Sequence, residues 1–329
     1  MIKGERQTPT LPEERDTPAI RTLDLAKRYG KITALSGLSM SVPRGEVFGF
    51  LGPNGAGKTT AVKLLLGLAR PTGGEGWVLS APLGDLQVRR RVGYLPELFR
   101  YQEWLTAREV LALHCSLARM PRRVWADEIT AALRLVGLDA RGDSRVSTFS
   151  KGMQQRLGLG VALLGSPDLV VLDEPTSALD PVGRVEVREI IHGLKRRGAT
   201  VFLNSHLLTE VEQVVDRVAV IDRGQVLALS SIADFTADTQ TVKVRLTGLA
   251  TSGSLEAGAF TLRPQMEGWW IARGIAREAV PDLVASLVGM GARVYAVEPG
   301  HHTLEERFLY LLKGGEHASG TDYRPADGV

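Results

Sequence analysis

One stretch of the chain has the glycine spacing and terminal lysine of a phosphate-binding loop. From Gly52 to Thr59 it reads GPNGAGKT, which matches G-x-x-x-x-G-K-(S/T) at every fixed position. Glycines let successive backbone N–H groups point into one concavity, and the following helix N-terminus adds partial positive charge. Lys58 is expected to reach the β- and γ-phosphates of a nucleotide, and Thr59 to ligate Mg²⁺. The predicted nucleotide-binding residues of the loop are Gly52, Asn54, Gly55, Gly57, Lys58, Thr59 and Thr60.

Two adjacent carboxylates follow a continuous apolar run. Leu169–Leu172 leads directly into Asp173 and Glu174. An acidic residue at the carboxyl end of a buried parallel strand lies where ligands bind in such sheets. Two carboxylates at that place repel each other unless a metal ion offsets their charge. We predict that Asp173 holds the hydration shell of Mg²⁺ and that Glu174 orients and polarises an attacking water.

The segment that carries these residues alternates strand-like apolar runs with helical patterns. This alternation, from Ala19 to about Ile232, is typical of an α/β fold with right-handed crossovers. The expected strands are residues 20–26, 38–42, 47–51, 76–80, 91–95, 169–172 and 200–204. The expected helices are residues 58–69 and 182–197, with a mainly helical stretch from 106 to 165.

Further motifs follow in a recognisable order. Tyr29 lies in KRYG, residues 150–156 read SKGMQQR, residues 177–180 read SALD, and His206 ends the sequence NSH. Together with the phosphate loop and the paired carboxylates, they make residues 20–230 resemble the ATP-binding subunit of an ATP-binding-cassette (ABC) transporter. The resemblance implies an ATPase with a phosphate-loop NTPase core, to which antiparallel β and helical subdomains are added.

The resemblance also implies roles for single residues. The catalytic residues would be Glu174, His206 and Lys58, and the further nucleotide-binding residues Tyr29, Ser150, Gly152 and Asp180. Tyr29 would stack on adenine, and His206 would contact the γ-phosphate. In the family, each ATP lies between one phosphate loop and the signature helix of a second subunit. We therefore expect a homodimer, or a heterodimer with a second ATP-binding subunit.

Two positions depart from the family pattern. The signature segment, usually LSGGQ, has Lys151 in place of its first glycine and Met153 in place of its glutamine, a form that resembles the ABC-2-type export branch. Glu97 stands where the family usually has a glutamine, after a predicted strand. A carboxylate is still an oxygen acceptor, so the predicted metal ligands are Thr59, Asp173 and Glu97.

The remaining chain predicts further parts. Residues 1–18 read as a flexible leader, 19–232 as the ABC ATPase domain with a helical subdomain at about 101–165, and 233–240 as a linker. Residues 241–313 show the pattern of a small α+β accessory domain, with strands at 242–246, 268–272 and 293–297 and helices at 276–289 and 303–312. The polar, glycine-rich residues 314–329 read as a disordered tail.

Composition limits the classes of function. The chain has 329 residues, a net charge of +3 and a single cysteine, so an intrachain disulfide scaffold is excluded. No run of 18 apolar residues occurs, which predicts a chain on the cytoplasmic face of the membrane rather than within it. The nearly balanced charge gives no reason to expect nucleic-acid binding.

An energising ATPase therefore needs membrane partners. We expect integral membrane permease subunits to dock near Glu97, where Leu98, Phe99, Tyr101 and Trp104 supply apolar and aromatic groups. The alternative is a soluble ABC ATPase that acts on nucleic acid or ribosomes, or as a regulator. Translation-type members carry two cassettes, and repair-type members insert a long coiled coil; this chain has one cassette and 173 − 58 = 115 positions between Lys58 and Asp173.

Overall fold

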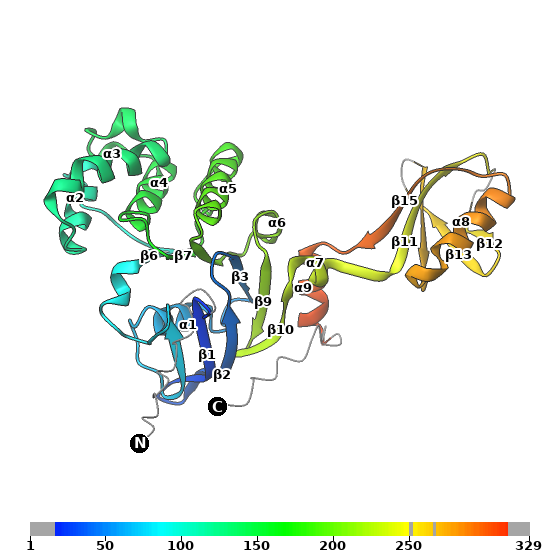
Figure 1. Cartoon of the computed structure of the whole chain (residues 1–329), viewed down its shortest axis with the longest axis horizontal. Coiled ribbons are helices and arrows are strands. Elements are labelled where there is room, and N and C mark those ends of the chain that lie inside the picture. Colours follow the sequence, from blue (N-terminus) through cyan, green and yellow to red (C-terminus); the bar gives the residue numbers. More distant parts are fainter. Residues whose placement is uncertain (1–16, 250–252, 266–267, 315–329) are drawn as a thin grey trace, which may run out of the picture. The chain divides into compact units, whose positions relative to one another are not determined.

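The computed structural model describes residues 17–249, 253–265 and 268–314, and it divides them into two units (Figure 1). The first unit extends to Ile232, and the second covers Ala233–Gly314. The predicted leader, except its last two residues, and the predicted tail after Gly314 lie outside the described residues.

A mixed, largely parallel sheet forms the centre of the first unit. Its strand order is β10-β9-β3-β8-β7-β6, in which only β9 and β10 pair antiparallel. The strands are β3 (Val47–Leu51), β6 (Val92–Leu95), β7 (Leu169–Asp173), β8 (Thr200–Asn204), β9 (Arg217–Asp222) and β10 (Gln225–Ser231). Every residue of β3, β7 and β8 is buried, as continuous apolar runs in parallel sheets predict. Because these strands are parallel, their carboxyl ends meet at one edge of the sheet.

A second, antiparallel sheet of the first unit has the order β2-β1-β4-β5. Its strands are β1 (Ile20–Tyr29), β2 (Ile32–Val42), β4 (Gly73–Val78) and β5 (Ala81–Pro82). Strand β2 begins six residues earlier than predicted, because a tight turn pairs Ile32 directly with Tyr29 and brings the polar residues after it into the ladder. Aromatic rings of the central sheet fill the core beside these strands, with Phe48 stacked on Phe202.

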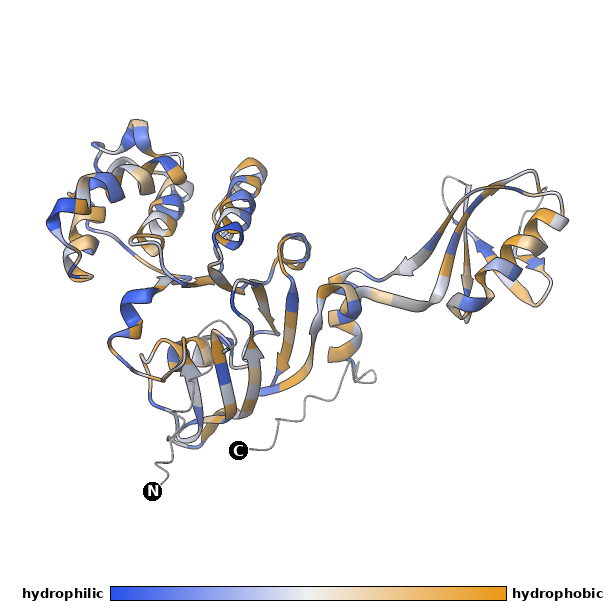
Figure 2. Ribbon diagram, viewed as in Figure 1, coloured by the Kyte–Doolittle hydropathy of each residue, from blue (hydrophilic) through white to orange (hydrophobic). Residues whose placement is uncertain are grey.

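Helices complete the first unit (Figure 1). They are α1 (Lys58–Leu65), α2 (Ala107–Leu117), α3 (Trp125–Leu135), α4 (Lys151–Ala162), α5 (Pro181–Arg196) and α6 (Leu208–Glu212). The short 3₁₀ turns described in the chain are Val88–Arg91, Arg122–Val124, Asp139–Arg141, Val146–Thr148 and Arg277–Ala279. Helices α2, α3 and α4 pack on one another, and each carries both apolar and polar residues (Figure 2). None of the helices in the described ranges has the length and apolar character needed to cross a bilayer.

The second unit is a five-stranded antiparallel sheet with helices. The order is β12-β13-β14-β11-β15, with β11 (Ala237–Thr247), β12 (Leu255–Ala257), β13 (Phe260–Pro264), β14 (Trp269–Arg273) and β15 (Arg293–His301). Its helices are α7 (Ile232–Thr236, which starts at the boundary), α8 (Val280–Gly289) and α9 (Leu304–Leu312). The sequence did not predict β12 and β13, because strands of three and five residues next to turns carry little periodic signal.

The segment 233–240, predicted as a linker, is folded. It carries most of α7 and the start of β11. Phe235 is fully buried, and its carbonyl accepts a hydrogen bond from Arg307 Nε at 3.2 Å. A buried aromatic side chain and a paired carbonyl are features of packed structure, so the weak periodicity of this segment did not indicate a flexible connection.

Candidate nucleotide-binding and hydrolysis site

The phosphate loop connects β3 to α1, and close packing explains two of its glycines. Gly57 caps the N-terminus of α1 with φ of +103°, and a Cβ there would lie 2.4 Å from the carbonyl oxygen of Ala34. A Cβ on Gly52 would lie 2.4 Å from the carbonyl oxygen of Ile221. The neighbouring strands therefore press against the loop from outside, which leaves room only for glycine at both positions. Asn54 and Gly55 are exposed at the tip of the loop.

Lys58 folds back over this loop. Its ammonium group donates to the carbonyl oxygens of Gly52 at 2.6 Å and Pro53 at 3.1 Å. The side chain is half-buried, and burial lowers its pKa. Carboxylates oppose that effect, in decreasing order Glu174, Asp173 and Glu97. The ammonium group thus lies in the field of three carboxylates that the sequence predicted as residues of the same site. Thr59 and Thr60 follow it in the first turn of α1.

Asp173 ends β7 and is 2% exposed. Its Oδ1 accepts a hydrogen bond of 2.5 Å from Nδ2 of Asn204, the last residue of the neighbouring strand β8. Burial raises the pKa of Asp173; the hydrogen bond from Asn204 lowers it, and the charge of Glu97 raises it. The raised pKa means that a cation near this carboxylate would be bound favourably, because it offsets the cost of burying the negative charge.

The carboxylate of Glu174 is held by two polar neighbours. Its Oε2 accepts a hydrogen bond from Ser205 Oγ at 3.2 Å and lies 2.8 Å from His206 Nδ1. Glu174 is 7% exposed, whereas the side chain of His206 is 63% exposed. The imidazole therefore reaches from solvent to the buried carboxylate. Such a pair is the arrangement that general base catalysis requires, with the base oriented by a third group.

The backbone of Glu174 is strained and held from two sides. Its φ of +55° lies in the left-handed region, which is unfavourable for a residue with a side chain. Its N–H donates to the carbonyl of Asn204 at 2.8 Å. From helix α4, Nε2 of the buried Gln155 donates to the carbonyls of Glu174 at 3.2 Å and Pro175 at 3.1 Å. These bonds keep the carboxylate in one position.

Ser150 and Asp180 each cap a helix. Ser150 Oγ accepts from the N–H of Met153 at 3.2 Å at the start of α4, and Asp180 Oδ1 accepts from the N–H of Gly183 at 2.8 Å at the start of α5. Gly152 lies in the first turn of α4. Both capping residues are exposed, and no hydrogen bond between described residues joins either to the phosphate loop. In this single chain Ser150 therefore acts as a helix cap.

Tyr29 and Glu97 lie on different parts of the first unit. Tyr29 ends β1; its ring is 46% exposed and lies under the ammonium group of Lys27 at 4.9 Å. Glu97 is exposed two residues after β6, and its charge acts on Lys58 and Asp173. Glu97 therefore lies at the same edge of the central sheet as Asp173 and Glu174. Tyr29 lies on the antiparallel sheet, where its ring is partly exposed.

The segment after Glu97 contains both exposed and packed aromatic or apolar residues. Leu98 and Trp104 are 87% and 72% exposed. Phe99 packs against Gly158 of α4, where a Cβ would lie 2.6 Å from its ring, and Phe99 and Tyr101 pack ring to ring at 5.2 Å. Burial raises the pKa of Tyr101. The expectation that all four residues form a docking surface is therefore wrong for Phe99 and Tyr101, because they anchor the segment to the helical subdomain.

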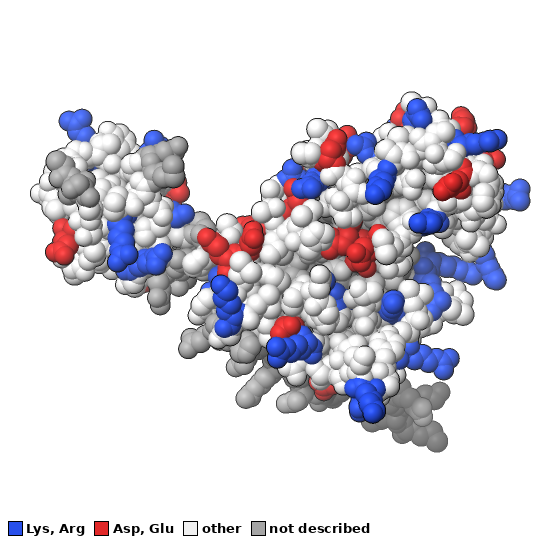
Figure 3. Space-filling model, turned by 180° about the vertical axis from the view of Figure 1, so that it is seen from behind, with Lys and Arg blue, Asp and Glu red and all other residues white. Residues whose placement is uncertain are grey.

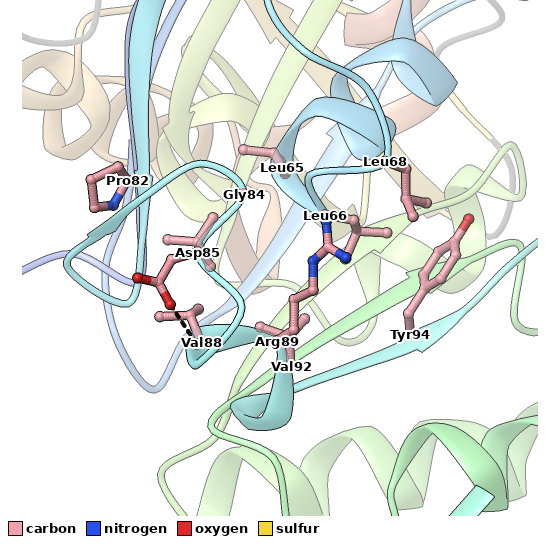
Figure 4. A pocket seen from close by; sticks show the side chains of 11 residues that line it. Leu65, Leu66, Leu68, Pro82, Gly84, Asp85, Val88, Arg89, Val92 and Tyr94 are labelled. Atoms are coloured by element: carbon pink, nitrogen blue, oxygen red, sulfur yellow. Dashed lines mark hydrogen bonds between the residues drawn. The ribbon is translucent and has the colours of Figure 1, made fainter. Parts of the chain in front are cut away.

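An apolar pocket of about 190 Å³ lies beside the end of α1 (Figure 4). Its lining residues are Leu65, Leu66, Leu68, Val78, Pro82, Gly84, Asp85, Val88, Arg89, Val92 and Tyr94. Burial, followed by the charges of Asp173 and Glu97, raises the pKa of Tyr94 to about 12. Tyr94 therefore lines the pocket and also lies in the electrostatic field of Asp173 and Glu97. We call the sheet edge that carries Asp173, Glu174 and Glu97 the acidic edge.

Sequence reasoning missed three residues that support the site. Asn204 and Ser205 bind the two carboxylates, and Gln155 binds the backbone of Glu174. A signal existed for the first two, since they follow a strand adjacent to β7 and directly precede His206. Gln155 carries no comparable signal, because only the packing of α4 against the loop after β7 brings it there.

The comparisons with known proteins agree with this geometry. A family model described as ABC transporter matches residues 35–177. An ABC transporter ATP-binding protein of Nostoc sp. is 40% identical over 312 residues, 91% of each chain. The bacitracin transport ATP-binding protein of Bacillus licheniformis is 42% identical over 211 residues, 63% of this chain and 68% of that one. A solved structure described as the ATP-binding subunit of an ABC transporter has a TM-score of 0.61 and 30% identity, covering 66% of this chain and 91% of that one.

The phosphate-loop NTPase fold predicted from the sequence is confirmed, and so is the function of an ATP-binding transport subunit over the soluble alternative. A solved structure described as a dimeric, post-hydrolysis state of an ATP-binding cassette bound to ADP and Pi has the same fold, with a TM-score of 0.60 and 24% identity, covering 65% of this chain and 98% of that one. The chain belongs to the family of ABC transporter ATP-binding proteins, which are ATPases that energise transport across membranes.

Proposed function

We propose that this chain drives export through ABC-2-type permease subunits, with hydrolysis at Glu174. The site is assigned from the buried carboxylate of Glu174. This carboxylate lies within hydrogen-bond distance of Ser205 and His206, and its charge acts on Lys58. Lys58 binds the β- and γ-phosphates, and Glu174 takes up the proton of the attacking water. His206 keeps the carboxylate oriented and presents its exposed side to the γ-phosphate.

Mg²⁺ fits the residues at this edge. Asp173 is buried beside Asn204, whose own Oδ1 is buried without a hydrogen-bond partner among the described residues. Mg²⁺ is a hard cation that binds one or two carboxylates, hydroxyl oxygens and phosphate oxygens. Asp173 and Thr59 would supply the carboxylate and the hydroxyl. The exposed carboxylate of Glu97 can accept hydrogen bonds from water molecules bound to the ion. When bound, the ion neutralises negative charge on the phosphates. Asn204 keeps Asp173 in the orientation that such binding needs.

The other surfaces complete the nucleotide site in a dimer. Tyr29 offers its exposed ring to adenine. The N-terminus of α4, with Ser150 and Gly152, offers a hydroxyl and backbone N–H groups to the γ-phosphate bound by a second subunit. Asp180 lies at the start of α5, where it caps the helix and orders residues 177–180 at the same interface.

A cytoplasmic segment of the permease contacts the exposed side chains of Leu98 and Trp104. Leu98 exposes a large apolar surface directly after Glu97, so a movement of the permease segment would change the position of this carboxylate. This contact holds the chain at the cytoplasmic face of the membrane. The Nod factor export ATP-binding protein of Rhizobium meliloti, 38% identical over 220 residues and 66% of each chain, supports an export role.

Co-purification tests the docking surface. Leu98→Asp with Trp104→Asp places two charges on the proposed surface and should abolish co-purification of the tagged chain with its co-expressed permease. The matched control is Leu117→Asp with Val182→Asp, two exposed apolar residues elsewhere in the first unit. Both double variants should keep the thermal unfolding midpoint of the wild type. Retention of the permease by the first variant would refute this docking site.

A further inference from the structure

The sheet of the second unit has one covered face and one open face. Helix α8 packs against the covered face, with contacts to β12 and β15. The side chains on that face are buried and apolar, among them Val242, Val244, Leu262 and Ala272. In Figure 1, α8 lies on the near side of the sheet, so the view from behind in Figure 3 looks onto the open face.

Basic residues gather on the open face. Residues paired across antiparallel strands point to the same side, and neighbours along a strand point to opposite sides. The register pairs Lys243 with Ile271 and Arg245 with Trp269, each next to a buried residue. The same rule places further basic residues on this face; together they are Lys243, Arg245, Arg263, Arg273 and Arg293. We call these five residues the basic face.

Acidic side chains do not balance this charge. In the part of the second unit with described side chains, the open face carries two carboxylates, Glu256 on β12 and Glu298 opposite Lys243 on β15. The second unit in Figure 3 accordingly shows more Lys and Arg than Asp and Glu on the visible side. Arg245, Arg263, Arg273 and Arg293 are exposed, so their charges are available to a partner.

Two amphipathic aromatic residues lie among these charges. Trp269 is half-buried opposite Arg245, and Tyr295 is 64% exposed, with its hydroxyl 3.4 Å from Thr247 Oγ1. Tryptophan and tyrosine have an apolar body and a polar tip, and they are favoured where apolar material meets water and polar headgroups. The open face thus combines positive charge with side chains suited to a membrane interface.

We propose that the basic face binds the anionic headgroups of a phospholipid bilayer. Charge complementarity demands an acidic partner, and the chain belongs to a family whose members act at membranes. A second copy of the same face is excluded as partner in a two-fold contact, because the basic residues of the two copies would repel each other. Single-stranded RNA is the competing acidic partner, and the experiment separates the two.

Vesicle flotation of the full chain tests this proposal. The wild-type chain should float with vesicles of equal parts phosphatidylcholine and phosphatidylglycerol and not with pure phosphatidylcholine. Each basic side chain near an anionic bilayer strengthens binding about fivefold, so Lys243→Ala with Arg245→Ala should weaken partitioning roughly thirtyfold. Rising salt should release the wild-type chain, because the attraction is screened.

The control removes the same charge elsewhere. Arg90→Ala with Arg134→Ala takes two exposed arginines from the first unit and should leave flotation unchanged. Both double variants should hydrolyse ATP at the wild-type basal rate, which verifies folding. Equal flotation of wild type and Lys243→Ala/Arg245→Ala, or equal binding to both vesicle types, overturns the proposal. Tight binding of an RNA oligonucleotide that is lost in this variant, without flotation of the wild type, assigns the face to nucleic acid instead.

Discussion

Replacing Glu174 by glutamine should separate ATP binding from ATP hydrolysis. The glutamine has the shape of the glutamate, and its amide oxygen can still accept from Ser205 and His206, which lie 3.2 and 2.8 Å from the carboxylate. The backbone bonds that hold the strained residue do not involve the side chain. The change therefore removes the basic oxygen and little else. Loss of a general base lowers a rate by about 10²–10⁴-fold, or roughly 3–5 kcal/mol in activation free energy.

Two measurements on Glu174→Gln test this reasoning. Phosphate release with saturating ATP and Mg²⁺ gives kcat, and titration with a fluorescent ATP analogue gives Kd. We expect kcat to fall by the factor given above while Kd stays almost unchanged. In the presence of ATP, the variant should elute as a dimer on gel filtration. Lys58→Ala is the contrasting variant, because it removes the main positive charge on the phosphates and should weaken binding itself. A Glu174→Gln rate within tenfold of the wild type would show that Glu174 does not activate the water.

Two further variants test the groups around Glu174. Asp173→Asn should raise the unfolding midpoint of the nucleotide-free chain at neutral pH, because burial raises the pKa of Asp173 and its ionised form destabilises the fold. This increase in the unfolding midpoint should vanish at acidic pH, where the wild-type carboxyl is protonated in both folded and unfolded states. An increase that does not depend on pH in thermal scans would contradict this explanation. Gln155→Ala removes the amide that donates to the buried carbonyls of Glu174 and Pro175, so kcat should fall while KM stays nearly constant. Gln155→Glu should not restore kcat. An unchanged kcat in steady-state kinetics would refute the positioning role of Gln155.

The sequence predicts best where one short segment determines the structure. The loop from Gly52 to Thr59 is such a segment, because its glycine spacing and terminal lysine identify it without the rest of the chain, although the atoms that exclude a Cβ at Gly52 and Gly57 belong to Ile221 and Ala34. The strand before Asp173 is another, since a continuous apolar run indicates a parallel strand with a functional carboxyl end. These two segments suffice for the fold class and for most of the acidic edge.

Prediction fails where distant segments meet. Phe99 and Trp104 are both aromatic residues, so the sequence alone does not distinguish them. The ring of Phe99 packs against Gly158, which has no side chain, whereas Trp104 is exposed. The burial of Phe235 likewise depends on packing within the second unit, so the segment that contains it looked like a linker. In each case the deciding atom belongs to a residue far away in the sequence, and no local pattern reports it.

The bond from Gln155 to the loop after β7 bears on how a dimer of such chains works. Helix α4 begins at Ser150, the residue proposed to face a nucleotide held by the second subunit. The same helix holds the backbone of its own Glu174 through Gln155. A rigid helix cannot shift at its first turn and remain still one turn later. If α4 closes on a nucleotide held by the second subunit, as proposed above, we therefore expect the Glu174 carboxylate of its own site to be repositioned, which would couple the two ATP sites.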